Sequence, residues 1–224
     1  MARPAAIITT GPASAPIDEV RRITNAASGE TGALLANALV SLGWEVFLCR
    51  GGGATYTGAP DGSSLHEFET NEDLTRLLAK IAETRGPDIA AFFHAAALSD
   101  YKVASVNGPH GPIAHTGKIP GDLASMQIIL EPAAKILPRL RGWFPRAWVA
   151  AWKYELAGTR EEAIAVARGQ LVPGHTDATV VNGAAYGLGF GVLEGKNPPL
   201  HLATKRELAD FLASRAAMAA KADK

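Results

Sequence analysis

The residues with the clearest chemical potential follow the first apolar run of the chain. Residues 5–10 read AAIITT and lead directly into Gly11, and the sequence SGETG at residues 28–32 then opens a stripe of apolar residues at helical spacing. The free N–H groups and the dipole of a helix N-terminus favour an anion such as a phosphate, and glycines let a ligand approach the backbone closely. This pattern indicates a nucleotide site at a strand–turn–helix junction, although the glycine spacing alone fits tight helix–sheet packing equally well.

The turn between this strand and helix is long for a dinucleotide site. About 18 residues separate Gly11 from Gly29, whereas turns of this kind normally have only a few residues. An NAD site would also place Asp or Glu near the end of the second strand, where this chain has Cys49 and Arg50. Because Arg50 could meet a 2′-phosphate, an NADP-dependent oxidoreductase stays open as an alternative.

The elements that must position these residues alternate between strand and helix signals. Strands are expected at 5–10, 44–49, 65–69, 88–97, 124–130, 147–152 and 177–181, a terminal hairpin at 189–193 and 199–203, and helices at 32–42, 70–85, 132–141, 159–170 and from 204 onward. The alternation predicts one domain over residues 1–224, an α/β Rossmann-like fold of three layers with a mainly parallel sheet. A polar tail is expected at about 216–224.

Residues 99–123 differ from the rest of the chain. They are rich in Gly, Pro and His and show no clear period. A long irregular segment inside a compact domain is usually a lid, a flap or an interface arm. We therefore expect a long flap here.

Composition excludes several classes of protein. Lys plus Arg and Asp plus Glu are each 22, so the net charge of zero argues against a nucleic-acid binder. A single cysteine, Cys49, cannot form an internal disulfide and fits a reducing compartment. Without a signal peptide or an 18-residue apolar run, the sequence predicts a cytoplasmic protein with no membrane span. The histidine and cysteine spacings also make a protein-held zinc site unexpected, and no GxSxG of a serine hydrolase is present.

Several motifs occur in a specific order over roughly residues 5–215. They are IITTGP followed by PIDEVRRITNAASGETG, FFHAAALSDYKV at 92–103, GKIP at 117–120, a helix–strand segment at 129–158 that includes WKYE, and ATVVNG at 178–183. Together they resemble the phosphopantothenate–cysteine ligase family, also called phosphopantothenoylcysteine synthetase, in its single-domain eukaryotic-type form. The resemblance implies that ATP or CTP, with Mg²⁺ held mainly by phosphates, activates the carboxylate of 4′-phosphopantothenate. The amine of cysteine would then attack the acyl-nucleotidylate, in coenzyme A biosynthesis and within a homodimer.

The resemblance also implies roles for individual residues. Asn25 would stabilise the acyl-nucleotidylate and Lys118 would reach the triphosphate, so both are expected to be catalytic. Nucleotide binding is implied for Gly11, Ser28, Gly29, Gly32, Ala96, Asp100, Lys118 and Trp152, and substrate binding for Arg21, Asn25 and Asn182.

Departures from the family pattern gather where phosphates are expected. Ala13-Ser14-Ala15 stands where the family usually has a threonine and a basic residue, and Glu30 replaces a basic residue. A diverged homologue that uses another acid, or that has no activity, therefore stays open beside the ligase interpretation.

Overall fold

The computed structural model describes residues 3–114, 116–171 and 175–222 and is built on one large sheet. Its strands are β1 (Ala5–Thr10), β4 (Glu45–Gly51), β5 (Ser63–Phe68), β6 (Ile89–His94), β10 (Trp148–Tyr154), β11 (Ala178–Asn182), β12 (Phe190–Leu193) and β13 (Leu200–Leu202). Their order is β13-β12-β11-β10-β6-β1-β4-β5, and the six strands from β11 to β5 run parallel. The expected mainly parallel α/β sheet is confirmed.

Helices cover both faces of this sheet, because alternate residues of the central strands point to opposite sides. On one face α1 (Glu30–Ser41) and α5 (Lys205–Ala222) pack on residues such as Ile8 and Phe93. On the other face α2 (Asn71–Arg85) and α3 (Leu140–Trp143) pack on neighbours such as Ile7 and Phe92. A smaller cluster joins α4 (Arg160–Arg168) to β11 and β12. The three-layer arrangement is therefore confirmed, and no described helix is long and apolar enough to cross a membrane.

Helix starts follow the signals in the sequence. Capping boxes open α2 at Thr70 with Asp73 and α4 at Thr159 with Glu162, so each box satisfies backbone donors at the helix start. Gly43 adopts a left-handed φ of 80° just after α1, as a helix-ending glycine commonly does.

Two helical expectations were wrong. A helix over 132–141 does not form: β9 runs Gln127–Pro132, and only a 3₁₀ turn at Leu137–Arg139 and the short α3 follow. Pro138 explains this, because proline restricts the residue before it and cannot donate to a helical bond. The polar tail does not begin at 216: α5 continues to Ala222 and buries Ala216, since this alanine-rich stretch favours helix.

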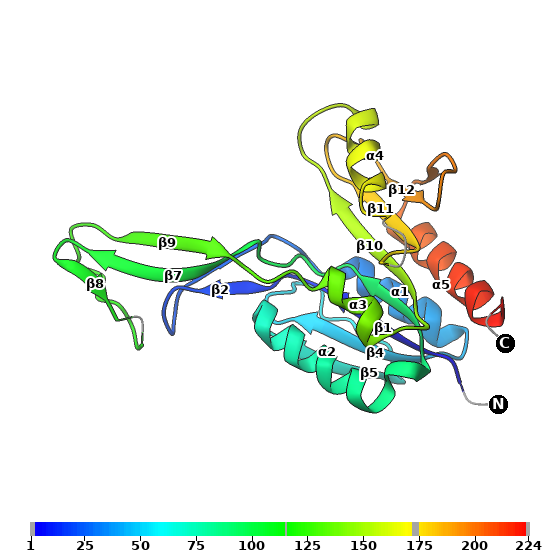
Figure 1. Cartoon of the computed structure of the whole chain (residues 1–224), viewed down its shortest axis with the longest axis horizontal. Coiled ribbons are helices and arrows are strands. Elements are labelled where there is room, and N and C mark those ends of the chain that lie inside the picture. The colour runs from blue at the N-terminus through cyan, green and yellow to red at the C-terminus, as the bar shows by residue number, and fades with distance from the viewer. Residues whose placement is uncertain (1–2, 115, 172–174, 223–224) are drawn as a thin grey trace.

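The segment expected to be an irregular flap is regular in its first half. β7 (Tyr101–Gly108), β8 (Gly111–Ile113) and β9 form a three-stranded antiparallel sheet that projects as a long arm from the central sheet (Figure 1). Gly108 and Gly111 pair on either side of the hairpin turn between β7 and β8, with Pro109 in the turn and Gly111 at φ 117°. The expected flap at 99–123 thus extends to Pro132 and holds two strands within the range read as irregular.

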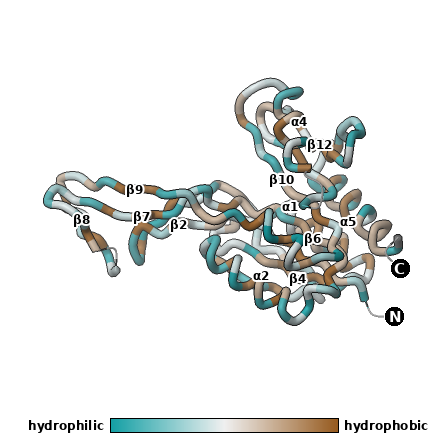
Figure 2. Tube along the Cα trace, in the orientation of Figure 1, coloured by the Kyte–Doolittle hydropathy of each residue, from teal (hydrophilic) through white to brown (hydrophobic). Residues whose placement is uncertain are grey.

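The same arm contains the long first turn. β2 (Ser14–Pro16) and β3 (Arg22–Thr24) form an antiparallel hairpin, and β2 lies beside β7 (Figure 1). Apolar and polar residues are interspersed along the arm (Figure 2). Residues 14–24, within the stretch between Gly11 and Gly29, therefore build part of the arm.

Candidate active site

Two glycines shape the junction between β1 and α1. Gly11 and Gly29 have φ values of 75° and 83°, which other residues rarely adopt. A Cβ atom would lie 3.0 Å from the Cβ of Ala54 at Gly11 and 3.1 Å from it at Gly29. Both positions thus require glycine for the backbone and for the close approach of the loop that carries Ala54.

Gly32 is required by helix–sheet packing. A Cβ atom at Gly32 would lie 2.3 Å from the Cβ of Thr10, and the Thr10 hydroxyl donates to the carbonyl of Gly29 at 3.0 Å. The close approach at Gly32 is therefore to the strand. The packing explanation accounts for this glycine without a ligand, and a role in nucleotide binding stays a prediction.

The start of α1 has no side-chain cap from its N-cap residue. Gly29 is the N-cap, and Ser28 accepts a hydrogen bond from the Glu30 amide at 3.3 Å. The first amides of a helix have no partner within the helix. Glu30 forms an ion pair with Lys205, the first residue of α5. The acidic residue that departs from the family pattern is thus neutralised by a lysine from the other end of the chain.

The segment after β6 is tied to the first turn. The Ala97 amide donates to the Gly11 carbonyl at 2.9 Å, and the Ala13 amide donates to the Ala97 carbonyl at 3.0 Å. The Asn25 side chain donates through Nδ2 to the carbonyls of Ala97 at 3.2 Å and Leu98 at 3.0 Å. The structure therefore brings Asn25 and Gly11 together with residues 95–97, the AAA segment that contains Ala96.

Trp152 and Asn182 lie on neighbouring strands. Trp152 is half-buried and packs against the core on the α1 and α5 face, whereas Lys153 forms an ion pair with Glu155 at 3.0 Å. Asn182 ends β11, and its carbonyl accepts from the Glu155 amide at 2.9 Å. Parallel strands end at one edge of a sheet, where ligands of such folds bind. Both residues thus lie toward the edge where β1 meets α1.

Asp100 stands at the base of the arm. Its side chain is 73% exposed and forms an ion pair with Lys135, and its carbonyl accepts from the Ala133 amide at 2.9 Å. The carboxylate is accessible to a ligand but already has a cationic neighbour.

Lys118 and Arg21 lie elsewhere, on the arm. The Arg21 guanidinium donates to the Ile119 carbonyl at 3.0 Å and pairs with Asp18 at 3.2 Å. The residues around Lys118 are thereby held against the turn between β2 and β3, on an arm that points away from α1 (Figure 1). Within one chain, the structure does not bring these two side chains to the glycine junction.

Two functional candidates were missed by sequence reasoning. Asp18 has a fully buried side chain that accepts from the amides of Val20, Arg21 and Ile119. Burial raises the pKa of Asp18, but these hydrogen bonds and Arg21 outweigh it and lower the pKa below its ordinary value. Lys205 is the second. The PID sequence contained the signal for Asp18, whereas no local signal pointed to Lys205.

Arg50 loses its role in the oxidoreductase alternative. It donates to the Thr57 carbonyl at 2.7 Å and to Glu67 at 2.8 Å, and its side chain is only 12% exposed. A guanidinium engaged on both sides is poorly placed to meet a 2′-phosphate.

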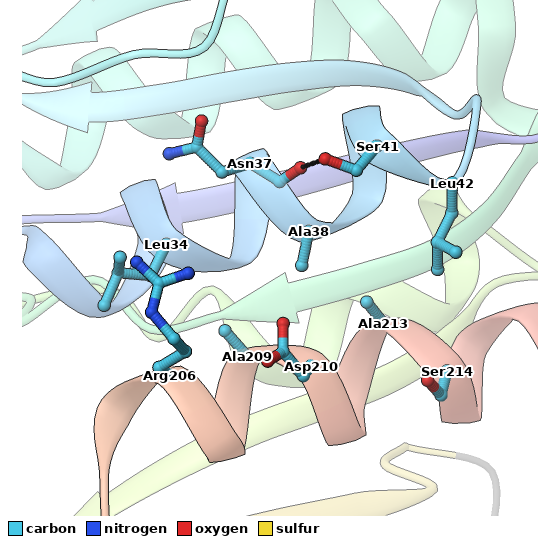
Figure 3. A pocket seen from close by; sticks show the side chains of 10 residues that line it. All are labelled: Leu34, Asn37, Ala38, Ser41, Leu42, Arg206, Ala209, Asp210, Ala213 and Ser214. Atoms are coloured by element: carbon cyan, nitrogen blue, oxygen red, sulfur yellow. Dashed lines mark hydrogen bonds between the residues drawn. The ribbon is translucent and has the colours of Figure 1, made fainter.

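Two hollows of the molecule lie away from this junction. One of about 240 Å³ lies between α1 and α5 (Figure 3), where the Ser41 hydroxyl donates to the Asn37 carbonyl at 2.9 Å. A larger one of about 950 Å³ is lined by Pro4, Ile89 and Trp148, which stand at strand beginnings. Within the described residues no group of three or more His, Cys, Asp or Glu side chains could hold a metal ion. The candidate site is thus the open edge at β1, β6 and β10.

Known proteins resemble this chain over most of its length. The model of the DNA/pantothenate metabolism flavoprotein C-terminal domain family matches residues 1–218. The coenzyme A biosynthesis bifunctional protein CoaBC of Thermococcus kodakarensis is 31% identical over 215 residues, which are 92% of this chain and 49% of that protein. This chain therefore spans about half the length of that curated relative.

Solved structures share the fold. The DNA/pantothenate metabolism flavoprotein from Streptococcus pneumoniae has a TM-score of 0.82 at 22% identity, covering 96% of this chain and 98% of that one. A Cab2 H337A mutant in complex with phosphopantothenate-cysteine has a TM-score of 0.71 at 15% identity, covering 98% and 88%. With the family model matched over nearly the whole sequence, this chain belongs to the DNA/pantothenate metabolism flavoprotein C-terminal domain family.

Proposed function

We propose that this chain is a phosphopantothenate–cysteine ligase of coenzyme A biosynthesis, built as a single domain and active in the cytoplasm. The observation that carries this proposal is the placement of Asn25 between the glycine junction of β1 and α1 and the AAA segment after β6. The relative named for coenzyme A biosynthesis and the fold shared with a protein bound to phosphopantothenate-cysteine support it.

The chemistry requires an activated carboxylate, because a free carboxylate is a poor electrophile at neutral pH. A nucleoside triphosphate would convert the acid into an acyl-nucleotidylate with release of pyrophosphate. The amides at the start of α1 would then face phosphate oxygens, where the helix dipole also favours negative charge. The Lys205 partner of Glu30 supports this, since it offsets the one acidic charge in that turn.

Asn25 would act on the second half of the reaction. Its amide nitrogen has two hydrogens, and the Ala97 and Leu98 carbonyls provide two acceptors for them. The amide oxygen is then the part of Asn25 left for a ligand. An acceptor suits the N–H of the incoming cysteine amine, so we assign Asn25 to orienting that amine beside the acyl-nucleotidylate.

The nucleotide would be ATP or CTP with Mg²⁺. Trp152 offers its ring to the base and Asp100 offers a carboxylate at the base of the arm, whereas Asn182 offers its amide to the acid substrate from the neighbouring strand end. Because the described residues contain no cluster of metal ligands, phosphate oxygens would supply most ligands of Mg²⁺.

A homodimer would complete the site. The arm exposes six apolar side chains by 40% to 56%: Val20, Ile23, Tyr101, Met126, Ile129 and Leu130. The arm also carries Lys118 and Arg21 away from the α1 of its own chain. Both facts fit an arm that packs on a second copy and delivers these cations to the site of that copy.

Pyrophosphate release tests the activity. The assay combines ATP or CTP with 4′-phosphopantothenate or a panel of other acids, with and without cysteine. The proposal predicts pyrophosphate release that depends on 4′-phosphopantothenate and formation of the cysteine adduct. Turnover with another acid only would support a diverged homologue, and thermal stabilisation by NADP⁺ alone would support the oxidoreductase alternative.

Complementation tests the shared site. Asn25→Asp alters the core side of the site and Lys118→Ala alters the arm side. Mixed dimers would pair one intact core with one intact arm, so an equal mixture should recover about a quarter of wild-type activity if subunits exchange freely. If all the residues of a site came from one chain, the mixture would stay as inactive as its components.

A further inference from the structure

A buried carboxylate joins the hairpin turn of the arm to the segment that carries Lys118. Asp18 Oδ1 accepts from the amides of Val20 at 2.9 Å and Arg21 at 2.7 Å, and so shapes its own turn. Its Oδ2 accepts from the Ile119 amide at 3.1 Å, across 101 positions of sequence. The residue after Lys118 is therefore bonded directly to Asp18.

Arg21 closes the same connection from the other side. Its guanidinium pairs with Asp18 Oδ2 at 3.2 Å and donates to the Ile119 carbonyl at 3.0 Å. Both backbone groups of Ile119 are thus bonded to this pair, and Ile119 is only 2% exposed.

Glu19 holds the residue before Lys118. The Gly117 amide donates to the Glu19 carboxylate at 3.0 Å, and the Glu19 amide donates to the Gly117 carbonyl at 3.3 Å. Lys118 therefore lies between two clamped neighbours, while its own side chain keeps solvent access. A flexible, strongly hydrated lysine gains a defined starting point for its side chain only when its backbone is fixed.

We propose that Asp18 and Arg21 form a latch that positions Lys118, so that they are positioning residues for the lysine that meets the triphosphate. This inference rests on the proposed ligase function. It also gives Arg21 a task on the arm, in addition to the substrate contact that the family resemblance implied. Fixing a catalytic group in advance matters because a displacement of about 1 Å at a reacting group can cost about a hundredfold in rate.

Asp18→Asn tests the latch. The variant keeps the size of the side chain but replaces one acceptor oxygen with an amide nitrogen, which cannot accept from the Ile119 N–H and loses the charge that holds Arg21. We expect kcat/KM for the nucleotide to fall by about tenfold or more, and hydrogen exchange of the Ile119 amide to accelerate.

Asp73→Asn is the matched control. Asp73 also accepts from two backbone amides, those of Thr70 at 3.0 Å and Glu69 at 3.3 Å, and pairs with the arginine three positions on. It caps α2 instead of the arm. A loss of melting temperature shared by both variants measures the structural cost of such a change, whereas only Asp18→Asn should alter nucleotide kinetics.

A double variant that combines Asp18→Asn with Lys118→Ala distinguishes positioning of Lys118 from a general weakening of the arm. If the latch acts through Lys118, Asp18→Asn should have no further effect on kcat/KM once Lys118 is alanine. The latch is overturned if wild type is active, Lys118→Ala is impaired, and Asp18→Asn behaves as Asp73→Asn does. A wild-type chain with no pyrophosphate release would instead overturn the ligase function itself.

Discussion

The side chain of His94 should make the stability of the fold depend on pH. His94 is the last residue of β6, and its Nδ1 atom lies 2.8 Å from the hydroxyl oxygen of Thr9. Burial lowers the pKa of His94 from an ordinary 6.5 to about 4. The folded protein thus keeps this imidazole neutral at pH values where the unfolded chain already binds a proton.

The direction follows from proton binding in the two states. Between pH 6.5 and 4 the unfolded chain holds more protons at His94, so stability falls as the pH falls. The gap between the two pKa values limits this loss to about 3 kcal/mol, at about 1.4 kcal/mol per pKa unit. Between pH 7 and pH 5 the expected loss is about 2 kcal/mol. The carboxyl groups of Asp18, Glu45 and Asp73 have pKa values lowered from ordinary values of 3.8, 4.5 and 3.8, so the stability that they contribute is lost mainly below pH 5.

His94→Gln isolates the effect. Glutamine does not titrate but can still bond to Thr9. Urea unfolding followed by tryptophan fluorescence at pH 7, 6 and 5 gives the free energy of unfolding of both proteins. The stability of wild type relative to the variant should decline by about 2 kcal/mol from pH 7 to pH 5. Parallel pH profiles would refute the argument and indicate that the ring takes up a proton in the folded state.

Three further predictions concern the site and its surroundings. Asn25→Asp replaces the amide that donates to the Ala97 and Leu98 carbonyls with a carboxylate that cannot donate, so the melting temperature should fall, and steady-state assays should show kcat lowered by about 10² because the amine is no longer oriented. Lys205→Ala leaves the Glu30 carboxylate without its cationic partner beside the phosphates, so the nucleotide Kd of this variant, measured by calorimetry, should rise by about tenfold. Adding Glu30→Gln to Lys205→Ala should restore the wild-type Kd. Burial raises the pKa of the Cys49 thiol to about 12, so iodoacetamide should label it only after unfolding, as intact mass would show.

The central sheet was readable from the sequence because its signals are local. The AAIITT and DIAAFFH runs are strands buried on both faces, and such strands carry near-continuous apolar residues. The two capping boxes were equally local, since each lies within four residues. These features needed no knowledge of distant contacts.

The arm was misread because its glycines and prolines were taken as a property of the whole segment. In the structure Gly108, Pro109 and Gly111 mark one hairpin turn, and YKVASV before it is a strand. An antiparallel pair that is exposed on most of its surface lacks the apolar signature of a core strand. The pairing of β7 with residues 127–132 could therefore not be predicted from local sequence signals.

For the candidate site, too, local contacts were predictable from the sequence and distant ones were not. The glycine junction with Asn25 follows from a short stretch of sequence, and the structure brings these residues together. The order of motifs also suggested that Lys118 belongs beside them, but order along a chain does not specify distance in space. The arm separates Lys118 from the junction, so the proposed site needs a second copy of the chain to bring them together.

The charges at the site show why a count of matched motif residues can underestimate the evidence for activity. Glu30 departs from the expected basic residue, and taken alone it predicts a weakened phosphate site. Lys205 lies 175 positions away in sequence and pairs with it, because α1 and α5 pack side by side. Asp18 and Ile119 are similarly joined across 101 positions. A phosphate responds to the summed field of all nearby charges, whatever their order in the chain. The loss of one motif residue is thus evidence against activity only after the elements packed on it have been searched for a replacement.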